Sequence, residues 1–258
     1  MDERPKVTVY VPVYNTAEYV AECLDSILDQ SYTNMEILIS DDGSSDGSID
    51  ICREYVKKDS RVQVFERGEP HGSCGDINFS LSHATGEFAC KMDSDDLMGE
   101  HYWENVLPYF NKPTVGIVSI GLMIMDSTGT SLLRNEFPMR LSGPVEIFHA
   151  NRFYSGCPFR MEMYRQVGGW DIGHLHPDWD FWIRCLFNKW EWTYCMKQVY
   201  YYRKHQKSIL FASNDEKREV ARAYYRQKYV KEMDTWGLQP APPGSQAIGL
   251  PKCGKIDA

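Results

Sequence analysis

Two aspartates separated by one residue are candidate metal ligands. Asp93 and Asp95 directly follow an apolar segment that ends at Met92, so both carboxylates emerge at the tip of an expected strand. If the chain stays extended there, both side chains point to one side and can share a hard divalent cation such as Mg²⁺ or Mn²⁺. Such ions use few protein carboxylates and fill their other positions with water and substrate phosphates. The alternative is an ordinary loop in which Asp96 caps a helix that begins near Glu100.

Polar clusters also follow two earlier expected strands, at Pro12 to Asn15 and at Asp41 to Ser48. In an open parallel sheet, ligands bind beyond the carboxyl ends of the strands. One such cluster could be turn chemistry alone, since Asp, Asn, Ser and Gly all favour turns. Three clusters on one edge favour a ligand site, because concentrated carboxylates repel one another unless a cation or hydrogen-bond donors intervene.

The elements that would position these clusters alternate in type along the first half of the chain. Strand-like and helical periodicities succeed each other, which indicates βαβ units and a mostly parallel sheet flanked by helices. Asn15, with Glu18 three residues on, predicts the start of the first helix. The expected strands are Val7–Val13, Glu36–Ser40, Val62–Phe65 and Glu87–Met92, and the expected helices begin at Val20 and Ile49 and cover residues 73–84.

The second half is less regular. The C-terminal residues from Gly237 onward are rich in proline and glycine, have no periodicity, and are expected to be extended. We therefore predict one α/β domain over residues 1–235 and a Pro/Gly-rich tail over residues 236–258. The elements expected in the second half are strands at 115–126, 131–134 and 199–203 and helices at 178–187 and 215–233.

Composition excludes several classes of protein. The 258 residues are 43% apolar and carry a formal charge of −8, which argues against nucleic acid as a partner, although one cationic pocket for a diphosphate remains compatible. No secretory signal or membrane-spanning segment is expected, because the longest mainly apolar run, 115–125, is too short to cross a bilayer. The eight cysteines form no C-x-x-C pair, which is typical of reduced thiols. We expect a cytoplasmic protein, with peripheral membrane contact compatible.

The ordered motifs resemble glycosyltransferase family 2, a family of inverting enzymes with a GT-A fold. In the donor half the resemblance rests on three motifs: Val11-Pro-Val-Tyr-Asn15, Asp41-Asp-Gly-Ser-Ser-Asp46 and Asp93-Ser-Asp-Asp96. It extends into the acceptor half through three more: Gly168-Gly-Trp-Asp171, Asp178-Trp-Asp-Phe-Trp-Ile-Arg184 and Tyr202-Arg-Lys-His205. Phe159-Arg-Met161 and Asp178-Trp-Asp180 are most similar to the transferase domains of bacterial chondroitin-type polymerases.

The resemblance implies a mostly parallel, Rossmann-like GT-A sheet with a smaller acceptor-side subregion. Residues 5–98 would bind a nucleotide sugar, residues 99–210 would form the acceptor half, and residues 211–235 would be a C-terminal helix. The donor site would be formed by Pro12, Tyr14, Asn15, Asp41, Asp42, Asp93 and Ser94. A carboxylate that faces uracil can accept its ring N–H, which favours a UDP-sugar.

The resemblance also implies a metal site and a general base. Asp93, Asp95 and His205 would hold Mn²⁺ or Mg²⁺ across the diphosphate. Asp178 would be the base that deprotonates the acceptor, and a helix N-terminus would favour its ionised form. Two alternatives stay open: Asp178 could be only an N-cap, or Asp180 could be the base.

Some residues depart from the family pattern. Asp76-Ile77-Asn78 stands where many members have Ala-Arg-Asn, so the diphosphate contact of that Arg would come from Lys91, from Arg67 or from no residue at all. Pro177 replaces the acid that usually precedes the base. Residues 151–160 would line the acceptor site, with Arg160 a candidate ligand for a phosphate or carboxylate. Five tryptophans could stack on sugars, although burial in the core is the commoner role; they are Trp170, Trp179, Trp182, Trp190 and Trp192.

The implied function is transfer of a sugar, with inversion, from a UDP-sugar to a hydroxyl of a glycan or lipid-linked acceptor. One alternative is a catalytically silent module that binds a glycan or nucleotide. Another is a sugar nucleotidyltransferase, which is less compatible because Pro12-Val-Tyr-Asn15 lacks the glycines and cation of a triphosphate loop.

Overall fold

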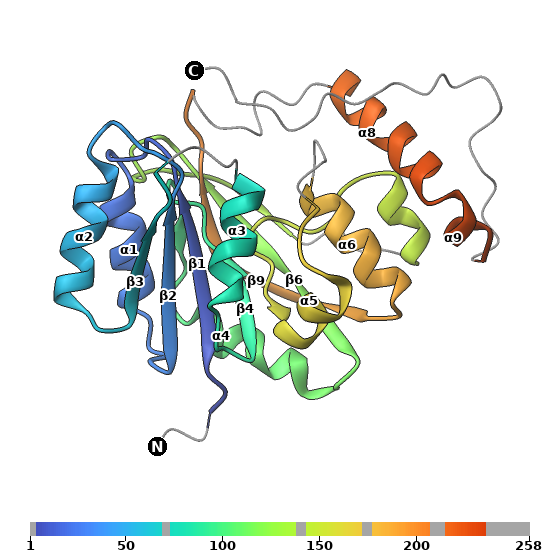
Figure 1. Ribbon diagram of the computed structural model, residues 1–258, viewed down its shortest axis with the longest axis horizontal. Coiled ribbons are helices and arrows are strands. Elements are labelled where there is room, and N and C mark those ends of the chain that lie inside the picture. The colour runs from blue at the N-terminus through green and yellow to red at the C-terminus, as the bar shows by residue number, and fades with distance from the viewer. Residues whose placement is uncertain (1–3, 69–72, 138–142, 172–176, 207–214, 236–258) are drawn as a thin grey trace.

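The computed structural model describes residues 4–68, 73–137, 143–171, 177–206 and 215–235 (Figure 1). Its first half is a parallel sheet flanked by helices, as predicted. The strands are β1 (Val7–Val13), β2 (Met35–Asp41), β3 (Val62–Glu66) and β4 (Phe88–Lys91), and the helices are α1 (Val20–Leu28), α2 (Ser48–Lys58) and α3 (Ser73–Ser82). β1 pairs in parallel with both β2 and β4, so the segments that follow these three strands emerge at one edge.

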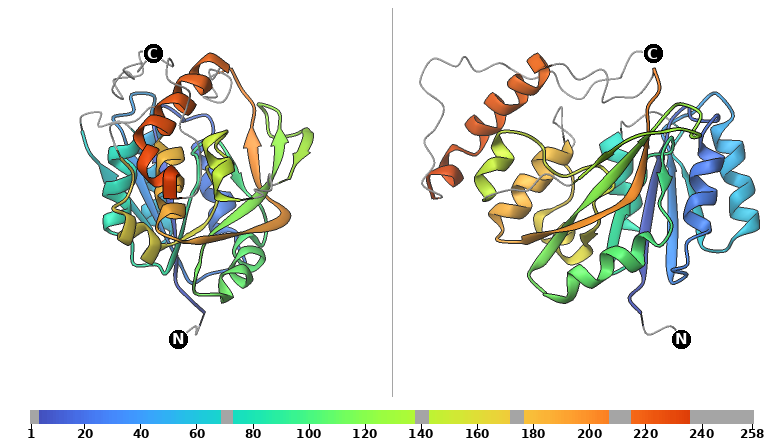
Figure 2. Two further views of the ribbon diagram at one scale, coloured as in Figure 1. Left: turned by 90° about the vertical axis from the view of Figure 1, so that its right-hand side faces the viewer. Right: turned by 180° about the vertical axis from the view of Figure 1, so that it is seen from behind.

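The second half extends the same sheet with two long strands. β6 (Val115–Met125) and β9 (Glu191–Arg203) pair in parallel, and Figure 2 shows them side by side from behind. Three shorter strands pair antiparallel with their neighbours: β5 (Leu97–Met98), β7 (Leu132–Glu136) and β8 (Phe159–Arg160). The order within the described residues is β3-β2-β1-β4-β8-β6-β9-β5, with β7 on β6. The fold is therefore mixed α/β. β9 begins eight residues before the expected strand at 199, whereas the predicted strand at 115–126 is confirmed within one residue.

Seven helices, from 5 to 14 residues long in the described parts of the chain, connect the strands of the second half or follow them. They are α4 (Tyr102–Val106), η1 (Leu107–Asn111), η2 (Pro144–Phe148), α5 (Met161–Val167), α6 (Pro177–Phe187), α8 (Asp215–Lys228) and α9 (Val230–Thr235). α8 lies at the opposite end of the molecule from α2 (Figure 1). The single helix expected over 215–233 is thus two helices. The predicted tail, residues 236–258, lies outside the described residues.

A buried charge explains why β2 tolerates a glutamate. The whole strand is buried, and Glu36 is 4% exposed. Its carboxylate accepts hydrogen bonds from Lys6 Nζ (2.8 Å), Thr8 Oγ1 (2.7 Å) and the Thr85 backbone (2.6 Å). Burial raises the pKa of Glu36, but these donors outweigh it and the net shift is downward. The glutamate joins β2 to the segments before β1 and β4.

The start of α1 differs from the prediction. The helix begins at Val20, and Tyr19 precedes it without a side-chain cap. Asn15 lies in the left-handed region, at φ 51°, where asparagine is favoured over most residues. The prediction that Asn15 caps the helix is wrong, because its side chain bonds to another loop instead.

The C-terminal helices are joined to α6 by one buried carboxylate. Asp180 is fully buried and accepts hydrogen bonds from Lys228 Nζ (2.6 Å), Tyr229 Oη (2.6 Å) and Arg184 Nε (2.7 Å). Burial raises the pKa of Asp180, but these three donors outweigh it and lower the pKa overall. Asp180 therefore holds α8 and α9 against α6. None of the helices within the described ranges is long and apolar enough to cross a bilayer.

Candidate functional site

Hydrogen bonds bring the three predicted polar clusters together at one sheet edge. The Asn15 backbone N–H donates to Ser44 Oγ (3.0 Å), and Asn15 Oδ1 accepts the Ser45 N–H (2.9 Å). Thr16 Oγ1 donates to Ser94 Oγ (2.9 Å), which links the loop after β1 to the loop after β4. The prediction that the clusters meet is confirmed, although the side chain of Ser94 is only 4% exposed.

The two aspartates at the end of β2 have different surroundings. Asp41 is 5% exposed, and its Oδ2 accepts the N–H groups of Gly43 and Ser44 at 3.1 Å each, which forms the turn after the strand. Asp42 is only half-buried. On β1 and beyond it, Pro12 is half-buried and Tyr14 is 48% exposed. Asp42 and Tyr14 are thus more accessible to a nucleotide than Asp41.

Asp76 joins this group, although its spacing predicted no role. It lies in the first turn of α3, is 1% exposed, and accepts a hydrogen bond from Arg67 Nη1 at 3.3 Å. Burial, followed by a hydrogen bond to Asp42 and the charge of Asp42, raises the pKa of Asp76 to about 7 against the opposing charge of Arg67. Arg67 is therefore engaged with Asp76 and the Gly75 carbonyl, and Ile77 is buried.

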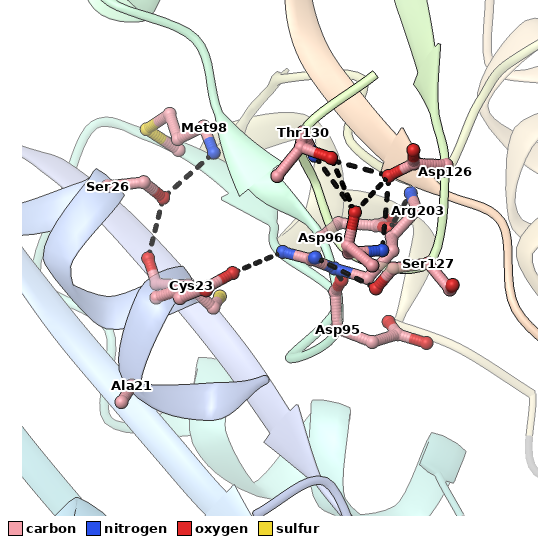
Figure 3. A network of polar contacts seen from close by, with 12 residues as sticks. Ala21, Cys23, Ser26, Asp95, Asp96, Met98, Asp126, Ser127, Thr130 and Arg203 are labelled. Atoms are coloured by element: carbon pink, nitrogen blue, oxygen red, sulfur yellow. Dashed lines mark hydrogen bonds and ion pairs between the residues drawn. The ribbon is translucent and has the colours of Figure 1, made fainter. Parts of the chain in front are cut away.

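Arg203 holds the loop that follows β4 (Figure 3). This arginine is 1% exposed, and its Nε donates to the Asp95 carbonyl at 2.8 Å, while its backbone N–H donates to Asp96 Oδ1 at 2.7 Å. Nη2 reaches Glu22 on α1 at 2.6 Å. Tyr200 Oη donates to Asp96 Oδ2 at 2.6 Å. The carboxylate of Asp96 is therefore buried on the inner side of the loop and bonded to β9. The alternative in which it caps a helix is wrong.

The three candidate metal ligands lie in two contacting pairs, one of which includes a lysine. His205 Nε2 lies 2.8 Å from Asp95 Oδ2, and Asp93 Oδ1 lies 2.5 Å from Lys91 Nζ. Burial and then the charge of Asp93 raise the pKa of Asp95, whereas the net shift in the pKa of Asp93 is downward because Lys91 and hydrogen bonds from Ser155 and Tyr200 outweigh its burial.

These pairs fit a divalent cation that takes part of its coordination from a diphosphate. Among the described residues, no three His, Cys, Asp or Glu side chains are grouped as ligands of one ion. A carboxylate in contact with an imidazole nevertheless supplies two donors of the kind Mn²⁺ accepts. The negative charges of Asp93 and Asp95 repel each other, and a bound cation would reduce this repulsion.

Asp178, the candidate base, lies near enough to Lys91 for its charge to act on the ammonium group. It is the second residue of α6 and is half-buried, and its charge contributes to the raised pKa of Lys91, behind the larger contribution of Asp93 and against burial, which lowers it. Asn151 Nδ2 donates to Asp178 Oδ2 at 2.7 Å. Asp180, the alternative base, is excluded by its three buried partners. The charges of the candidate base and of the candidate metal ligands Asp93 and Asp95 thus all act on Lys91.

On the acceptor side the prediction for Arg160 is wrong, whereas the expectation that most of the five tryptophans belong to the core is confirmed. Arg160 is 9% exposed, and its guanidinium donates to the carbonyls of Val115 (3.3 Å) and Phe110 (2.9 Å), so it is structural. Trp170, Trp179 and Trp182 are buried, and the Trp170 ring stacks on Phe181 with centroids 4.1 Å apart. These three tryptophans belong to the core rather than to a sugar platform. Trp190 and Trp192 are half-buried.

The mixed sheet superposes on solved structures that have the GT-A fold. The sequence profile described as "Glycosyl transferase family 2" matches residues 8–168, which is more than half of the chain. The chain belongs to glycosyl transferase family 2, and it is a glycosyltransferase.

Curated relatives come from bacteria. The chain is 29% identical to "Putative glycosyltransferase EpsH" of Bacillus subtilis over 91% of this chain and 74% of that protein. It is 37% identical to "Glycosyltransferase GlyG" of Streptococcus pneumoniae over 43% of this chain, a match that spans 37% of that protein.

Solved structures share the fold. The structure of S. aureus TarS 1–349 in complex with UDP-GlcNAc superposes with a TM-score of 0.70 at 19% identity, over 89% of this chain and 67% of that chain. The mannosyltransferase PcManGT from Pyrobaculum calidifontis, in complex with GDP-Man and Mn²⁺, superposes with a TM-score of 0.65 at 23% identity, over 94% of this chain and 67% of that chain. These neighbours bind nucleotide-sugar donors.

Proposed function

We propose that this glycosyltransferase moves a sugar, with inversion, from a UDP-sugar to a hydroxyl of a glycan or lipid-linked saccharide, with Asp178 as general base. The observation that carries the proposal is the arrangement around Lys91. Lys91 contacts Asp93, the charges of Asp93, Asp178 and Asp95 all act to raise its pKa, and Asp95 contacts His205. The nearness of these groups supports a reaction centre in which cation-binding side chains and a base lie around one lysine.

The donor would bind along the edge formed by the loops after β1, β2 and β4. Asp42 would accept the uracil ring N–H, and the exposed ring of Tyr14 would lie against the nucleoside, with Pro12 and Asn15 shaping the strand end. Asp41 and Ser94 would act mainly by holding the two loops in place. Because the structural neighbours carry UDP-GlcNAc and GDP-Man, the uracil preference rests on Asp42.

On the acceptor side, Asp178 would take the proton of the attacking hydroxyl as the new glycosidic bond forms. The bond between the anomeric carbon and the diphosphate oxygen breaks, and UDP leaves with the electron pair. Displacement from the opposite face inverts the anomeric carbon. Lys91, whose pKa is raised and which therefore stays charged at neutral pH, would stabilise negative charge in the same cleft.

Asp95 and His205, with Asp93, would hold Mn²⁺ or Mg²⁺, and a bound cation supplies neutralisation of the charge that develops on the departing diphosphate. In the 2.8 Å contact the Nε2–H of His205 donates to the Asp95 carboxylate, and a bound cation would take the place of that proton between the two side chains. Asp93 would exchange part of its contact with Lys91 for the cation.

We also propose a cytoplasmic setting. The six cysteines at described positions whose side chains are assigned are free and buried, as expected in a reducing compartment. Exposure to oxidised glutathione should leave their thiol count unchanged in the folded protein. Formation of a disulfide on the native fold would argue against this setting.

Donor and metal binding are tested by thermal unfolding. A ligand that binds only the folded form stabilises it by RT ln(1 + [L]/Kd), so UDP with Mn²⁺ at about 100 Kd adds about 2.7 kcal/mol. Chelation should abolish this gain, and so should His205→Gln in the presence of Mn²⁺. If UDP with chelator raises the melting temperature as much as UDP with Mn²⁺, the metal site is refuted.

Transfer itself is tested with Asp178→Asn. We expect transfer to fall about 10²–10⁴-fold, the contribution typical of a general base, while UDP binding is retained. Asp50→Asn makes the same chemical change on the exposed face of α2 and should leave the rate unchanged. Transfer by Asp178→Asn at the rate of the unaltered protein would show that another residue is the base.

The rival function is a silent module that binds nucleotide sugar without transfer. A screen of UDP-sugars for slow donor hydrolysis separates the two, because a silent module binds UDP with Mn²⁺ but releases no sugar. The same screen identifies the donor sugar.

A further inference from the structure

We propose that Asn151 is a positioning residue that sets the orientation of the base Asp178. The inference rests on the proposed role of Asp178 and deepens it. Asn151 lies 27 positions earlier in the chain, yet its side-chain amide donates to Asp178 Oδ2 at 2.7 Å. A donor at this distance fixes the direction of the carboxylate oxygen that accepts it.

The direction of the Asn151 amide is set by a second hydrogen bond. Its Oδ1 accepts the backbone N–H of Phe153 at 3.2 Å, so its NH₂ group is the end that faces Asp178. The reverse orientation would place two acceptors against each other and leave the Phe153 N–H without this acceptor.

The loop that carries Asn151 is held firmly against α6. Trp179, next to Asp178, is 3% exposed, and its Nε1 donates to the Ile147 carbonyl at 2.6 Å, just before the loop. Beyond Asn151, Ser155 donates a hydrogen bond to Asp93. The segment from 147 to 155 therefore contacts both the helix of the base and the side of the candidate metal ligands.

This geometry assigns different tasks to the two oxygens of Asp178. Oδ2 accepts the Asn151 amide, while Oδ1 is left to receive the acceptor proton. Holding one oxygen restricts rotation of the carboxyl, which positions the other. Replacement of the amide by an acceptor should both misorient the base and place a second negative charge beside it.

The decisive variant is Asn151→Asp. It keeps an oxygen for the Phe153 N–H and changes only the group that faces Asp178. Two carboxylates in hydrogen-bond contact hold one proton between them at pH values where isolated carboxylates are ionised. We expect the acidic limb of kcat to move up by at least about one pH unit, so that kcat at a given pH on that limb falls about tenfold and recovers at higher pH.

The test requires that no other ionisable group near Asp178 titrates over the same pH range. Three groups lie near enough for the charge of Asp178 to affect their pKa: Lys91 on β4, Tyr10 on β1 and Tyr225 on α8. Burial raises the pKa of both tyrosines above its usual value, and the pKa of Lys91 is also raised. None of the three groups therefore changes charge between about pH 5 and pH 9. His176 lies outside the described residues, and a parallel series in a His176→Gln background removes its titration.

A second variant covers the case in which Asn151→Asp unfolds. Asn151→Ala should lower kcat about 10- to 100-fold, with the KM for the UDP-sugar and the Kd for UDP unchanged. Asn111→Asp is the matched control, since Asn111 is exposed on η1, and it should reproduce the unaltered pH profile.

The outcomes distinguish this inference from the proposed function. If Asp178→Asn is inactive but both Asn151 variants keep the unaltered kcat and pH profile, Asn151 has no positioning role. If Asp178→Asn transfers sugar normally, the base assignment fails and the inference fails with it. A shifted acidic limb in Asn151→Asp, absent in Asn111→Asp, supports it.

Discussion

Asp76→Asn should stabilise the protein at neutral pH and have little effect in acid. The folded protein holds the Asp76 proton more tightly than the unfolded chain does, because the carboxyl is buried beside Asp42. Its contribution to stability is therefore complete below the usual pKa of 3.8 and is lost as the pH rises through about 7. An asparagine never has to ionise, so it avoids this loss.

The magnitude follows from the difference between the two pKa values. About three units at about 1.36 kcal/mol each gives a ceiling of roughly 4 kcal/mol above pH 7. Relaxation around the ionised carboxyl recovers part of it, so we expect a gain of about 2 kcal/mol. Asparagine can still accept from Arg67 through Oδ1, as the aspartate does.

Urea unfolding at pH 4 and pH 7.5 measures the effect, with the m-value checking that only stability has changed. Asp59→Asn is the matched control, because Arg61 lowers the pKa of Asp59 and its substitution should therefore cost stability at pH 7.5. The reasoning is refuted if Asp76→Asn destabilises at pH 7.5, or if its effect is the same at both pH values.

Two further substitutions test how the fold supports the site. Asp180→Asn removes the buried carboxylate partner of Lys228 and should lower the free energy of unfolding, measured in urea at pH 7, by about 3–5 kcal/mol. Because the pKa of Asp180 is lowered in the folded protein, this contribution to stability is present above the usual pKa of an aspartate and is lost in acid. Asp171→Asn removes an exposed carboxylate from the same lysine and should cost less than about 1 kcal/mol, and equal losses would contradict the buried network. Gly86→Ala would place a Cβ 2.7 Å from a backbone nitrogen of β1 and should cost about 1–3 kcal/mol by thermal unfolding. Gly143→Ala meets nothing within 4 Å, so a similar loss there would mean that the close approach is not the cause.

Several features of the site were predictable from local sequence. The alternation of β-branched strands with helical spacing predicted the parallel half of the sheet, and β1 is confirmed over all seven residues. Because parallel strands end at one edge, the clusters after β1, β2 and β4 had to meet there. The positions of Asp93 and Asp95 were visible for the same reason, whereas the role of Asp178 followed from the family resemblance alone.

Where the local signals were ambiguous, tertiary contacts decided the role. Asn15 and Asp96 have the residue types of helix caps, yet Asn15 bonds to the loop after β2 and Asp96 lies beneath the loop after β4. Asp180 has the chemistry of a base, and only the arrival of Lys228 at the end of α8 and of Tyr229 between α8 and α9 removes it from consideration. Arg160 has a suitable charge but is used by carbonyls of the core.

The sequence by itself determined the family, the sheet edge and the acids that line it, because these depend on residue type and on spacing within a strand or helix. Only the tertiary structure decided which groups face one another. His205 meets Asp95 across 110 positions, and Arg203 reaches Glu22 across 181. Spacing along a chain does not encode such distant contacts, because they depend on how whole elements pack. The pKa of Asp76 and the hydrogen bond from Asn151 to Asp178 arise from that packing.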